Sequence, residues 1–300
     1  MPDRRSILHF VTPLKNVSPF DVNMAVDAGF DVVVPYAHVE DKELTGLVQD
    51  AIFSRAPEDG RHTAILIGGR DPLVALDMLE TARQAMIPPH FEISAMADPS
   101  GAFTTAAGMI AVTEKHLKKL GRDLAGVRIG VFGATGPVGG AAGLIAARAG
   151  AQVMLVGHDG VERVASRCES FEKRFGVAMR PADGSDDAKK EEILGRVEVV
   201  LAAGRAGLQI LSREQLVRAG GLLVALDVNA VPPAGLEGVD AFDDGKPVEG
   251  GEVLGLGALA VGNIKFKTEH ELLAGMTDAS PRRHVGLDEA FEVARRHAAA

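Results

Sequence analysis

Residues 127–159 read VRIGVFGATGPVGGAAGLIAARAGAQVMLVGHD, and this stretch decides the fold. The apolar run at 127–132 predicts a buried strand, and the glycine-rich run at 133–139 predicts a turn. A small-residue helix ending near Gly150 follows, and the apolar run at 152–156 predicts a second strand. A strand, a glycine turn, a helix and a strand in this order are typical of a dinucleotide-binding βαβ unit.

Three glycines of this turn have separate expected tasks. Gly133 permits the tight turn, Gly136 lets the backbone approach a pyrophosphate, and Gly139 lets the helix pack against the strand. The start of the helix then offers free N–H groups and the positive end of its dipole to the phosphates. The alternative is a glycine-rich turn in an α/β domain that binds no ligand.

The composition narrows the class of protein. The chain has 300 residues, 46% of them hydrophobic, so it can bury a substantial core in one or two domains. The net charge of −9 argues against nucleic acid and against an anionic membrane as partners. Apolar runs such as 222–226 are too short to span a bilayer, and the first residues contain no apolar run long enough for a signal peptide. We therefore expect a cytoplasmic protein.

The cysteines and histidines of the sequence do not form the pattern of a metal site. Cys168 is the single cysteine, which excludes an internal disulfide and a cysteine metal site. The nine histidines are scattered, with no pair at the i, i+4 spacing of a helical metal site. We expect no metal.

Alternating strands and helices predict two α/β halves. In the first half the expected strands are 6–11, 31–36, 63–67 and 91–96, and the expected helices are 21–28, 41–53, 73–86 and 105–120. In the second half further strands are expected at 178–181, 197–203 and 222–227, and further helices at 161–175, 186–195, 212–219 and 288–299. The fold class is α/β with an N-terminal substrate domain, 1–124, and a Rossmann-type doubly wound domain, 125–262, with a cleft between them. A C-terminal helical segment, 263–300, is expected to pack back on the first domain.

Polar residues directly after the predicted strands are the candidate site, because ligands of open α/β sheets bind at the carboxyl ends of the strands. Each one alone could instead be a turn residue or a helix cap. They are Gly68, Gly69, Asp71, Asp98, Ser100, Thr104, Thr105, Gly204, Arg205, Asp227, Asn229 and Gly257.

Two lysines, Lys265 and Lys267, follow a small and apolar stretch at 251–262. In an extended segment both would share one face, whereas in a helix they would diverge and only one could face a ligand. The alternative is a solvated pair with no role in a site.

Five motifs in this order resemble the NAD(P)-dependent methylene-tetrahydromethanopterin dehydrogenases of methylotrophic bacteria, distant relatives of the methylene-tetrahydrofolate dehydrogenases. The resemblance runs over residues 7–273. The motifs are Gly68-Gly-Arg-Asp71, Thr104-Thr-Ala-Ala-Gly108, Gly133-Ala-Thr-Gly-Pro-Val-Gly139, Asp227-Val-Asn-Ala230, and Gly255-Leu-Gly-Ala258 with the chain to Lys267.

The resemblance implies an oxidoreductase of one-carbon metabolism and formaldehyde oxidation. Such an enzyme transfers a hydride reversibly from methylene-tetrahydromethanopterin to NAD(P)+ and gives the methenyl compound. It also implies a homo-oligomer based on a dimer or a trimer, and a pterin bound in the cleft. The implied catalytic residues are Lys265, Lys267 and Asp21, and the implied substrate-binding residues are Phe20, Asp98, Ser100, Thr104 and Thr105.

The expected roles of these charges follow from the cationic product. A lysine suits a carbonyl or carboxylate of the pterin, whereas an acidic residue suits the cation or the guanidine-like edge of the ring. Folate relatives with cyclohydrolase activity carry a tyrosine and, four residues later, a lysine. Here the single tyrosine, Tyr36, is six residues from Lys42, so we expect no cyclohydrolase activity.

The residues that follow the second strand of the unit decide between NAD and NADP. Asp159 could bond a ribose 2′-hydroxyl and repel a 2′-phosphate, while His158 accepts either cofactor and Arg163 lies within reach. We expect NAD to be preferred and NADP to be tolerated. The alternative for Asp159 is a cap of the next helix. The expected cofactor-binding residues are Gly133, Thr135, Gly136, Pro137, Val138, Gly139, His158, Asp159, Arg163, Ala203, Gly204, Asp227, Asn229 and Gly257.

Three rival functions stay open. One is a methylene-tetrahydrofolate dehydrogenase, because the two pterins share their reacting ring. Another is a different two-domain NAD(P) dehydrogenase such as the shikimate type, although Lys15 and Asp21 match its lysine–aspartate pair poorly. The third is a non-catalytic protein that senses nucleotides.

Overall fold

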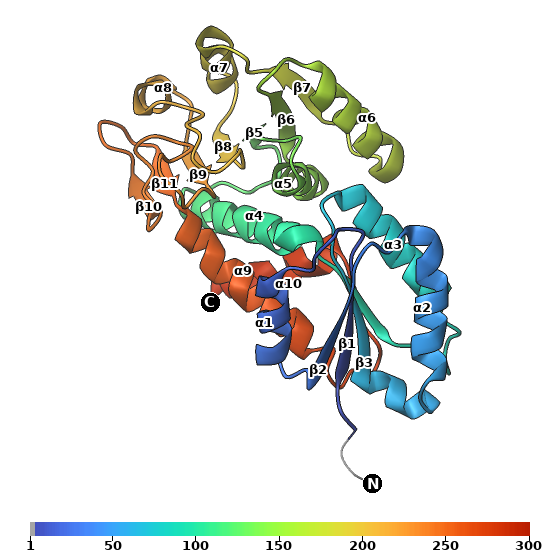
Figure 1. Cartoon of the computed structure of the whole chain (residues 1–300). Helices are drawn as coiled ribbons and strands as arrows, with labels where there is room; N and C mark the ends of the chain where they lie inside the picture. Colours follow the sequence, from blue (N-terminus) through green and yellow to red (C-terminus); the bar gives the residue numbers. More distant parts are fainter. Residues whose placement is uncertain (1–3) are drawn as a thin grey trace. The chain divides into compact units, whose positions relative to one another are not determined.

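Two sheets of mainly parallel strands organise the residues that the computed structural model describes, 4–300 (Figure 1). Residues 4–104 and 266–293 form the first unit, and residues 105–265 and 294–300 form the second. The boundaries expected from the sequence, at 124/125 and 262/263, stay a prediction; the division by contacts differs mainly in assigning residues 105–124 to the second unit.

The sheet of the first unit has the strand order β12-β4-β3-β1-β2, and every neighbouring pair is parallel. Its strands are β1 (Ile7–Val11), β2 (Val32–Tyr36), β3 (Thr63–Ile67), β4 (Ser94–Ala97) and β12 (His284–Val285). The order 2-1-3-4 followed by a fifth strand is a doubly wound topology, whose ligands bind where the winding reverses, between β1 and β3. Both β3 and β4 are buried along their whole length, which explains their unbroken apolar sequence.

The helices of the first unit begin where the capping residues predict. Helix α1 (Pro19–Asp27) starts after Ser18, whose hydroxyl accepts the N–H of Asp21, and α3 (Pro72–Gln84) starts after Asp71, whose carboxylate accepts two backbone N–H groups. Helix α2 (Asp41–Phe53) has the bounds expected from the sequence. Short 3₁₀ turns, η1 (Pro57–His62) and η2 (Pro99–Gly101), complete the unit.

The sheet of the second unit has the order β10-β11-β9-β8-β5-β6-β7. Its strands are β5 (Arg128–Phe132), β6 (Gln152–Gly157), β7 (Arg180–Asp183), β8 (Val199–Ala202), β9 (Val224–Asp227), β10 (Asp244–Pro247) and β11 (Leu254–Leu256). All neighbours are parallel except β10, which is antiparallel to β11. Numbered along the chain, the six parallel strands have the Rossmann order 3-2-1-4-5-6, so the predicted fold class is confirmed for this unit.

The helices that connect these strands are α5 (Pro137–Arg148), α6 (Glu162–Phe175), α7 (Asp187–Leu194) and α8 (Arg213–Arg218). The remaining helices, α4 (Ala102–Lys119), α9 (Ala258–Ala274) and α10 (Leu287–Ala299), contain residues of both units. Inside the second unit α4 approaches α9 closely at Gly108, where a Cβ would lie 3.2 Å from the carbonyl oxygen of Val261. No helix within residues 4–300 is long and apolar enough to cross a membrane.

Some sequence-based bounds were wrong. The strand expected at 91–96 begins only at Ser94, the one expected at 178–181 is shifted to 180–183, and the helix expected from 263 begins at Ala258. Strands β10, β11 and β12 were not predicted, because two to four residues are too few to show a period, and their partners are supplied by distant strands.

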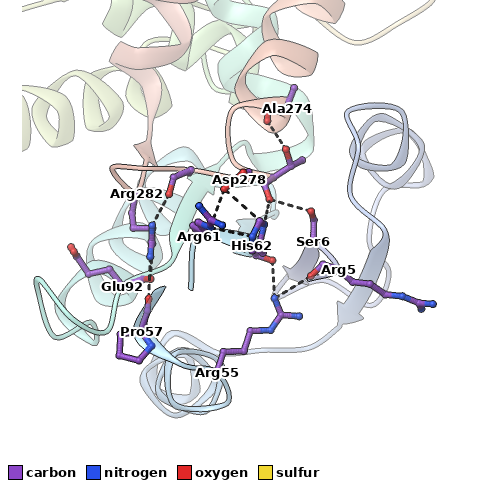
Figure 2. Close-up of polar contacts among 12 residues, drawn as sticks. Arg5, Ser6, Arg55, Pro57, Arg61, His62, Glu92, Ala274, Asp278 and Arg282 are labelled. Carbon is purple, nitrogen blue, oxygen red and sulfur yellow. Dashed lines mark hydrogen bonds and ion pairs between the residues drawn. The ribbon is translucent and has the colours of Figure 1, made fainter. Parts of the chain in front are cut away.

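A polar network joins residues 274–282 to the amino end of the first sheet (Figure 2). Arg282 donates to three carbonyl oxygens from three segments: Glu92 at 3.0 Å, Ala279 at 2.6 Å and Pro57 at 3.2 Å. His62 Nδ1 lies 3.2 Å from the carbonyl oxygen of Thr277, and Arg61 donates to its Nε2 at 3.2 Å. Because Nε2 accepts from Arg61, Nδ1 is the ring nitrogen that donates to the carbonyl oxygen of Thr277.

We expect Arg282→Ala to lower the free energy of unfolding by about 2–3 kcal/mol, because three carbonyl groups lose a charged donor. Chemical denaturation with a fluorescence or circular-dichroism readout measures the loss. The control is Arg83→Ala, which removes an exposed ion pair with Glu80 on α3, outside this network, and is expected to cost less than about 1 kcal/mol. Equal losses for the two variants would contradict this reading of the network.

A buried histidine connects helix α4 to strand β10 at the edge of the second sheet. His116 on α4 is 2% exposed, and its Nε2 lies 2.7 Å from a carboxylate oxygen of Asp244 on β10. Burial lowers the pKa of His116, more than the hydrogen bond with Asp244 raises it; the nearby Lys119 and Lys115 also lower it.

A lowered pKa in the folded state makes stability depend on pH in one direction. Below the unfolded value of 6.5 the unfolded chain binds a proton that the folded chain does not, so His116 favours folding above pH 6.5 and this contribution is lost as pH falls below it. We expect His116→Gln to flatten the fall in unfolding free energy below pH 6.5, by at most about 1.4 kcal/mol per pH unit. Denaturant titrations at several pH values test this, and an unchanged slope contradicts it.

Candidate functional site

The glycine turn follows the carboxyl end of β5, between strands β5 and β8, where the Rossmann winding reverses. Gly133 has a φ of +80°, and a Cβ there would lie 2.4 Å from the carbonyl oxygen of Ala203. A Cβ at Gly139 would lie 2.6 Å from the carbonyl oxygen of Gly133. The first glycine therefore makes the turn and the last one lets α5 pack on it, as the sequence predicts.

Gly136 is different from the other two glycines. It precedes α5 as the N-cap residue with φ −77°, and the nearest atom to a Cβ there would be the carbonyl oxygen of Gly133, at 3.3 Å. Its missing side chain thus leaves the outer side of the turn open. Thr135, Pro137 and Val138 beside it are half-buried.

The start of α5 offers hydrogen-bond donors without a side-chain cap. The first N–H groups of a helix have no acceptor inside the helix, and they carry the positive end of its dipole. The open side of the turn at Gly136, which a Cβ would fill, lies beside these uncapped N–H groups. This arrangement fits a pyrophosphate. The residues present therefore fit a dinucleotide.

The other predicted cofactor residues lie at the same edge of the second sheet. His158 and Asp159 follow β6, Ala203 and Gly204 follow β8, Asp227 ends β9 with Asn229 beyond it, and Gly257 follows β11. Since β5, β6, β8, β9 and β11 are parallel, their carboxyl ends share one rim. The topology thus brings these residues together; their contact with a cofactor stays a prediction.

Asp227 is 2% exposed and holds the loop that follows it. Its carboxylate accepts the N–H of Asn229 at 2.9 Å and that of Leu236 at 3.0 Å. Burial raises its pKa, although these backbone donors act to lower it. The side chain of Asn229 is likewise turned to its own loop, donating to Pro233 O and accepting from Val231 N. Both side chains are therefore occupied by hydrogen bonds to the backbone of this loop, and they fix its conformation at the rim.

Asp159 forms an exposed ion pair with Arg163, whose Nη1 lies 3.2 Å from its Oδ2. The hydrogen bond from Arg163 lowers the pKa of Asp159. His158 Nδ1 lies 3.9 Å from the same carboxylate. The helix-cap alternative for Asp159 is wrong, because the N-cap of α6 is Val161 and no side chain caps it.

A polar cavity of about 400 Å³ lies between the glycine turn and α6. Thr135 lines it from the turn, and Glu162, Arg163, Ser166, Arg167 and Ser170 line it from the helix. The sequence analysis missed Ser166, Arg167 and Ser170. Ser166 and Arg167 come three and four residues after Arg163, and Ser170 comes four and three residues after those two. This spacing along one helix face is the signal that could have found them.

The rim of the first unit is built around a buried carboxylate. Asp98 follows β4 and is 3% exposed. Its Oδ1 accepts the N–H groups of Phe103 at 2.8 Å and Thr104 at 3.3 Å, and its Oδ2 accepts the Thr104 hydroxyl at 2.6 Å. Asp98 thus binds the start of α4, and Thr104 is fully buried with it. Thr105 is half-buried.

Ser100 joins two loops of this rim. Its hydroxyl donates to the carbonyl oxygen of Gly69 at 2.6 Å, linking the turn after β4 to the turn after β3. The Ser100 backbone has φ +55°, a left-handed conformation that side chains other than glycine rarely adopt. Gly69 has φ +133°, and a Cβ at Gly68 would lie 2.9 Å from the Phe10 ring. The turns after β3 and β4 are therefore held close together at this rim.

The remaining substrate-side residues lie on helices. Phe20 and Asp21 are in the first turn of α1, which follows β1; Phe20 is 48% exposed and Asp21 is 4% exposed. Lys265 and Lys267 are both in α9, so the extended alternative is wrong and the two side chains diverge. Lys265 is half-buried and Lys267 is exposed.

Within residues 4–300 no group of three or more His, Cys, Asp and Glu side chains is arranged to hold a metal ion. Cys168 is buried on α6, and its burial raises the pKa of the thiol to about 11.

The two sheets, with a glycine turn at the reversal of the Rossmann winding, define an α/β protein of two units, one of them of dinucleotide-binding type. Solved structures share this fold. Shikimate 5-dehydrogenase of Listeria monocytogenes has a TM-score of 0.50 and 15% identity, with 96% of each chain covered. NAD-dependent malic enzyme of Thermotoga maritima has a TM-score of 0.54 and 14% identity, with 97% of this chain and 84% of that chain covered.

Sequence comparison gives the family. Residues 19–100 match the family described as methylene-tetrahydromethanopterin dehydrogenase, N-terminal. The NAD(P)-dependent methylenetetrahydromethanopterin dehydrogenase of Methylorubrum extorquens is 45% identical over 291 residues, 97% of this chain and 98% of that protein. Bifunctional protein MdtA of the same organism is 32% identical over 263 residues, 88% and 89% of the two chains. The chain belongs to the methylenetetrahydromethanopterin dehydrogenase family, which confirms the resemblance.

Proposed function

We propose that this protein is an oxidoreductase of one-carbon metabolism that transfers a hydride from methylene-tetrahydromethanopterin to NAD(P)+. The observation that carries the proposal is the 45% identity with a dehydrogenase of that name over 97% of the chain. The glycine turn at the reversal of the Rossmann winding supports it, because that turn fits a dinucleotide.

We assign the cofactor to the rim of the second unit. The backbone N–H groups of Val138 and Gly139 bind the pyrophosphate, and the loop held by Asp227 closes the rim beside it. When bound, NAD(P)+ supplies the hydride acceptor. The residues of the turn need only bind and orient it, since the reaction moves no proton in the hydride step.

We assign the pterin to the rim of the first unit. Asp98 and Ser100 act as positioning residues, because their polar atoms bind the start of α4 and the turn at Gly69. Phe20 offers an exposed ring for stacking, and Asp21 offers a carboxylate for the cation or the guanidine-like edge. Lys265 is the better candidate for a pterin carbonyl or carboxylate, because Lys267 is solvated.

We further propose that NAD is preferred and NADP is accepted. The Asp159 carboxylate is exposed and can accept a ribose 2′-hydroxyl, while its negative charge repels a 2′-phosphate. Arg163 is held by Asp159, yet it also lines the polar cavity with Ser166 and Arg167. Release of Arg163 from the ion pair would let it face a phosphate.

Asp159→Asn is therefore expected to raise the ratio of kcat/KM for NADP to that for NAD by about tenfold, because it removes a repulsive charge and frees Arg163. Steady-state kinetics with both cofactors measures the ratio. Glu214→Gln is the matched control, since Glu214 forms the same i, i+4 ion pair with an arginine on α8. A ratio that stays at the wild-type value in Asp159→Asn would count against this assignment.

The function itself is tested by mixing the purified protein with methylene-tetrahydromethanopterin and NAD, then NADP, and following the absorbance of reduced nicotinamide. Turnover on this carrier supports the proposal. Turnover only on methylene-tetrahydrofolate would move the substrate to the folate rival, and binding of NAD without turnover on either carrier would favour a sensor. Turnover of the methenyl compound itself, followed without nicotinamide, tests for the absence of cyclohydrolase activity, which the spacing of Tyr36 and Lys42 predicts.

A cytoplasmic location and a homo-oligomer also stay proposals. Light scattering of the purified protein tests the oligomer.

A further inference from the structure

A groove of about 1000 Å³ lies on one face of the sheet of the second unit, over β6 and β7. In the parallel register Met154 on β6 lies opposite Arg180 on β7, and Arg128 on β5 lies opposite Gln152 on β6. Side chains two residues apart on a strand share a face, so Arg128, Met154, Arg180 and Ala182 all belong to this face. It is the face on which Ile193 of α7 packs, because a Cβ at Gly130 of β5 would meet Ile193 at 3.7 Å.

The groove is open because helix α7 is short. Its eight residues span only about 12 Å. Met154 and Ala182 pack against the core beneath the helix, but both stay partly exposed. The outer strand β7 contains Pro181, which has no N–H, so the addition of another strand at this edge is disfavoured. Met154 and Ala182 therefore form an apolar surface that faces solvent, which we call the floor of the groove. The edge of the sheet beside this floor disfavours pairing with a further strand.

The residues that line the groove include more cations than carboxylates, although the whole chain carries a net charge of −9. The lining contains four cations, Arg128, Arg180, Lys189 and Arg196, and two carboxylates, Asp183 and Glu192.

Lys189 is held by Asp183 at 2.8 Å, and Arg196 pairs with Glu192. Arg128 donates to the carbonyl oxygen of Arg196 at 2.8 Å and lies 3.5 Å from Glu198. The side chain of Arg180 forms no hydrogen bond or ion pair with any residue of the range 4–300.

We propose that this groove is a second ligand site, which binds a small organic anion with an apolar body. The body lies on Met154 and Ala182, and a carboxylate, phosphate or sulfonate group is held by Arg180. The groove lies on the face of the sheet on which Ile193 packs, whereas α5 packs on the other face, where a Cβ at Gly143 would lie 2.8 Å from Leu155. The proposed site is therefore on the opposite face of the sheet from α5, and we expect it to bind its ligand while NAD is bound.

The test uses the full-length protein saturated with NAD and the fluorescent probe 8-anilinonaphthalene-1-sulfonate, which has an apolar body and one sulfonate. We expect the probe to bind in the presence of NAD and Arg180→Gln to weaken its binding about tenfold, since one charge-assisted hydrogen bond is lost. Ala182→Glu, which places a carboxylate on the floor, is expected to abolish binding. The control Arg218→Gln removes an exposed arginine on α8 and is expected to leave the affinity unchanged.

Two results would overturn the proposal. One is displacement of the probe by NAD, or equal affinity in the wild type and Arg180→Gln, since either means that the probe binds elsewhere. The other is dissociation of an oligomer in Ala182→Glu, seen by light scattering, with no change in probe binding; the groove would then be an interface between copies. Circular dichroism of each variant confirms that the fold is retained.

Discussion

Gly136→Ala is expected to weaken NAD binding at least about a hundredfold and to leave the protein folded. The backbone of Gly136 has φ −77°, which alanine adopts freely, and the nearest atom to the new methyl group would be Gly133 O at 3.3 Å. The methyl group would instead occupy the open side of the turn, where the pyrophosphate must approach the backbone. Isothermal titration with NAD measures the affinity, and a thermal melt without NAD measures the stability.

Two other glycines serve as controls. Gly220→Ala in the same unit meets no atom within 4 Å and is expected to change neither property. Gly133→Ala is expected to lower both, since its φ is +80° and the Cβ would lie 2.4 Å from Ala203 O. If Gly136→Ala bound NAD as the wild type does, the turn would not be the pyrophosphate site.

Lys265→Met has the second large expected effect, a fall in kcat/KM for the pterin of about 10- to 100-fold. Lys265 is half-buried, and its backbone lies close to α4, where a Cβ at Gly108 would be 3.4 Å from the Lys265 nitrogen. A half-buried ammonium that holds a pterin oxygen binds it more strongly than a solvated one does. Methionine keeps the length and the apolar stem of the side chain, so the loss reports the charge.

Lys267→Met is the matched control. Lys267 is exposed and lies two residues further on the same helix, on a different side of it. We expect its kcat/KM to stay within about twofold of the wild-type value. Steady-state kinetics at saturating NAD compare the two variants, and a larger loss for Lys267→Met would reverse the assignment.

The order of the elements follows from the sequence because it depends on local periodicity. The strand at 63–67 and the helix at 41–53 have the bounds expected from their apolar patterns. The glycine turn has the geometry expected of it, because only glycine adopts the φ of Gly133 without strain. Strands β10 and β12 could not be predicted, because they are stabilised by hydrogen bonds to β11 and β4 and not by their own residues.

The sequence by itself determined the family, the Rossmann unit and the residues at the carboxyl ends of the strands, since these depend on motifs and on the alternation of short segments. Only the tertiary structure decided how those residues are used. It showed that Asp98 and Asp227 bind the backbone of their own loops, that Asp159 is paired with Arg163, and that Lys265 and Lys267 diverge on a helix. The physical reason is that the sequence names a charged residue without naming its partner. An aspartate is the same residue in the sequence whether its carboxylate binds a backbone N–H, an arginine or water. Burial and distance alone decide among these partners, and both are properties of the folded chain.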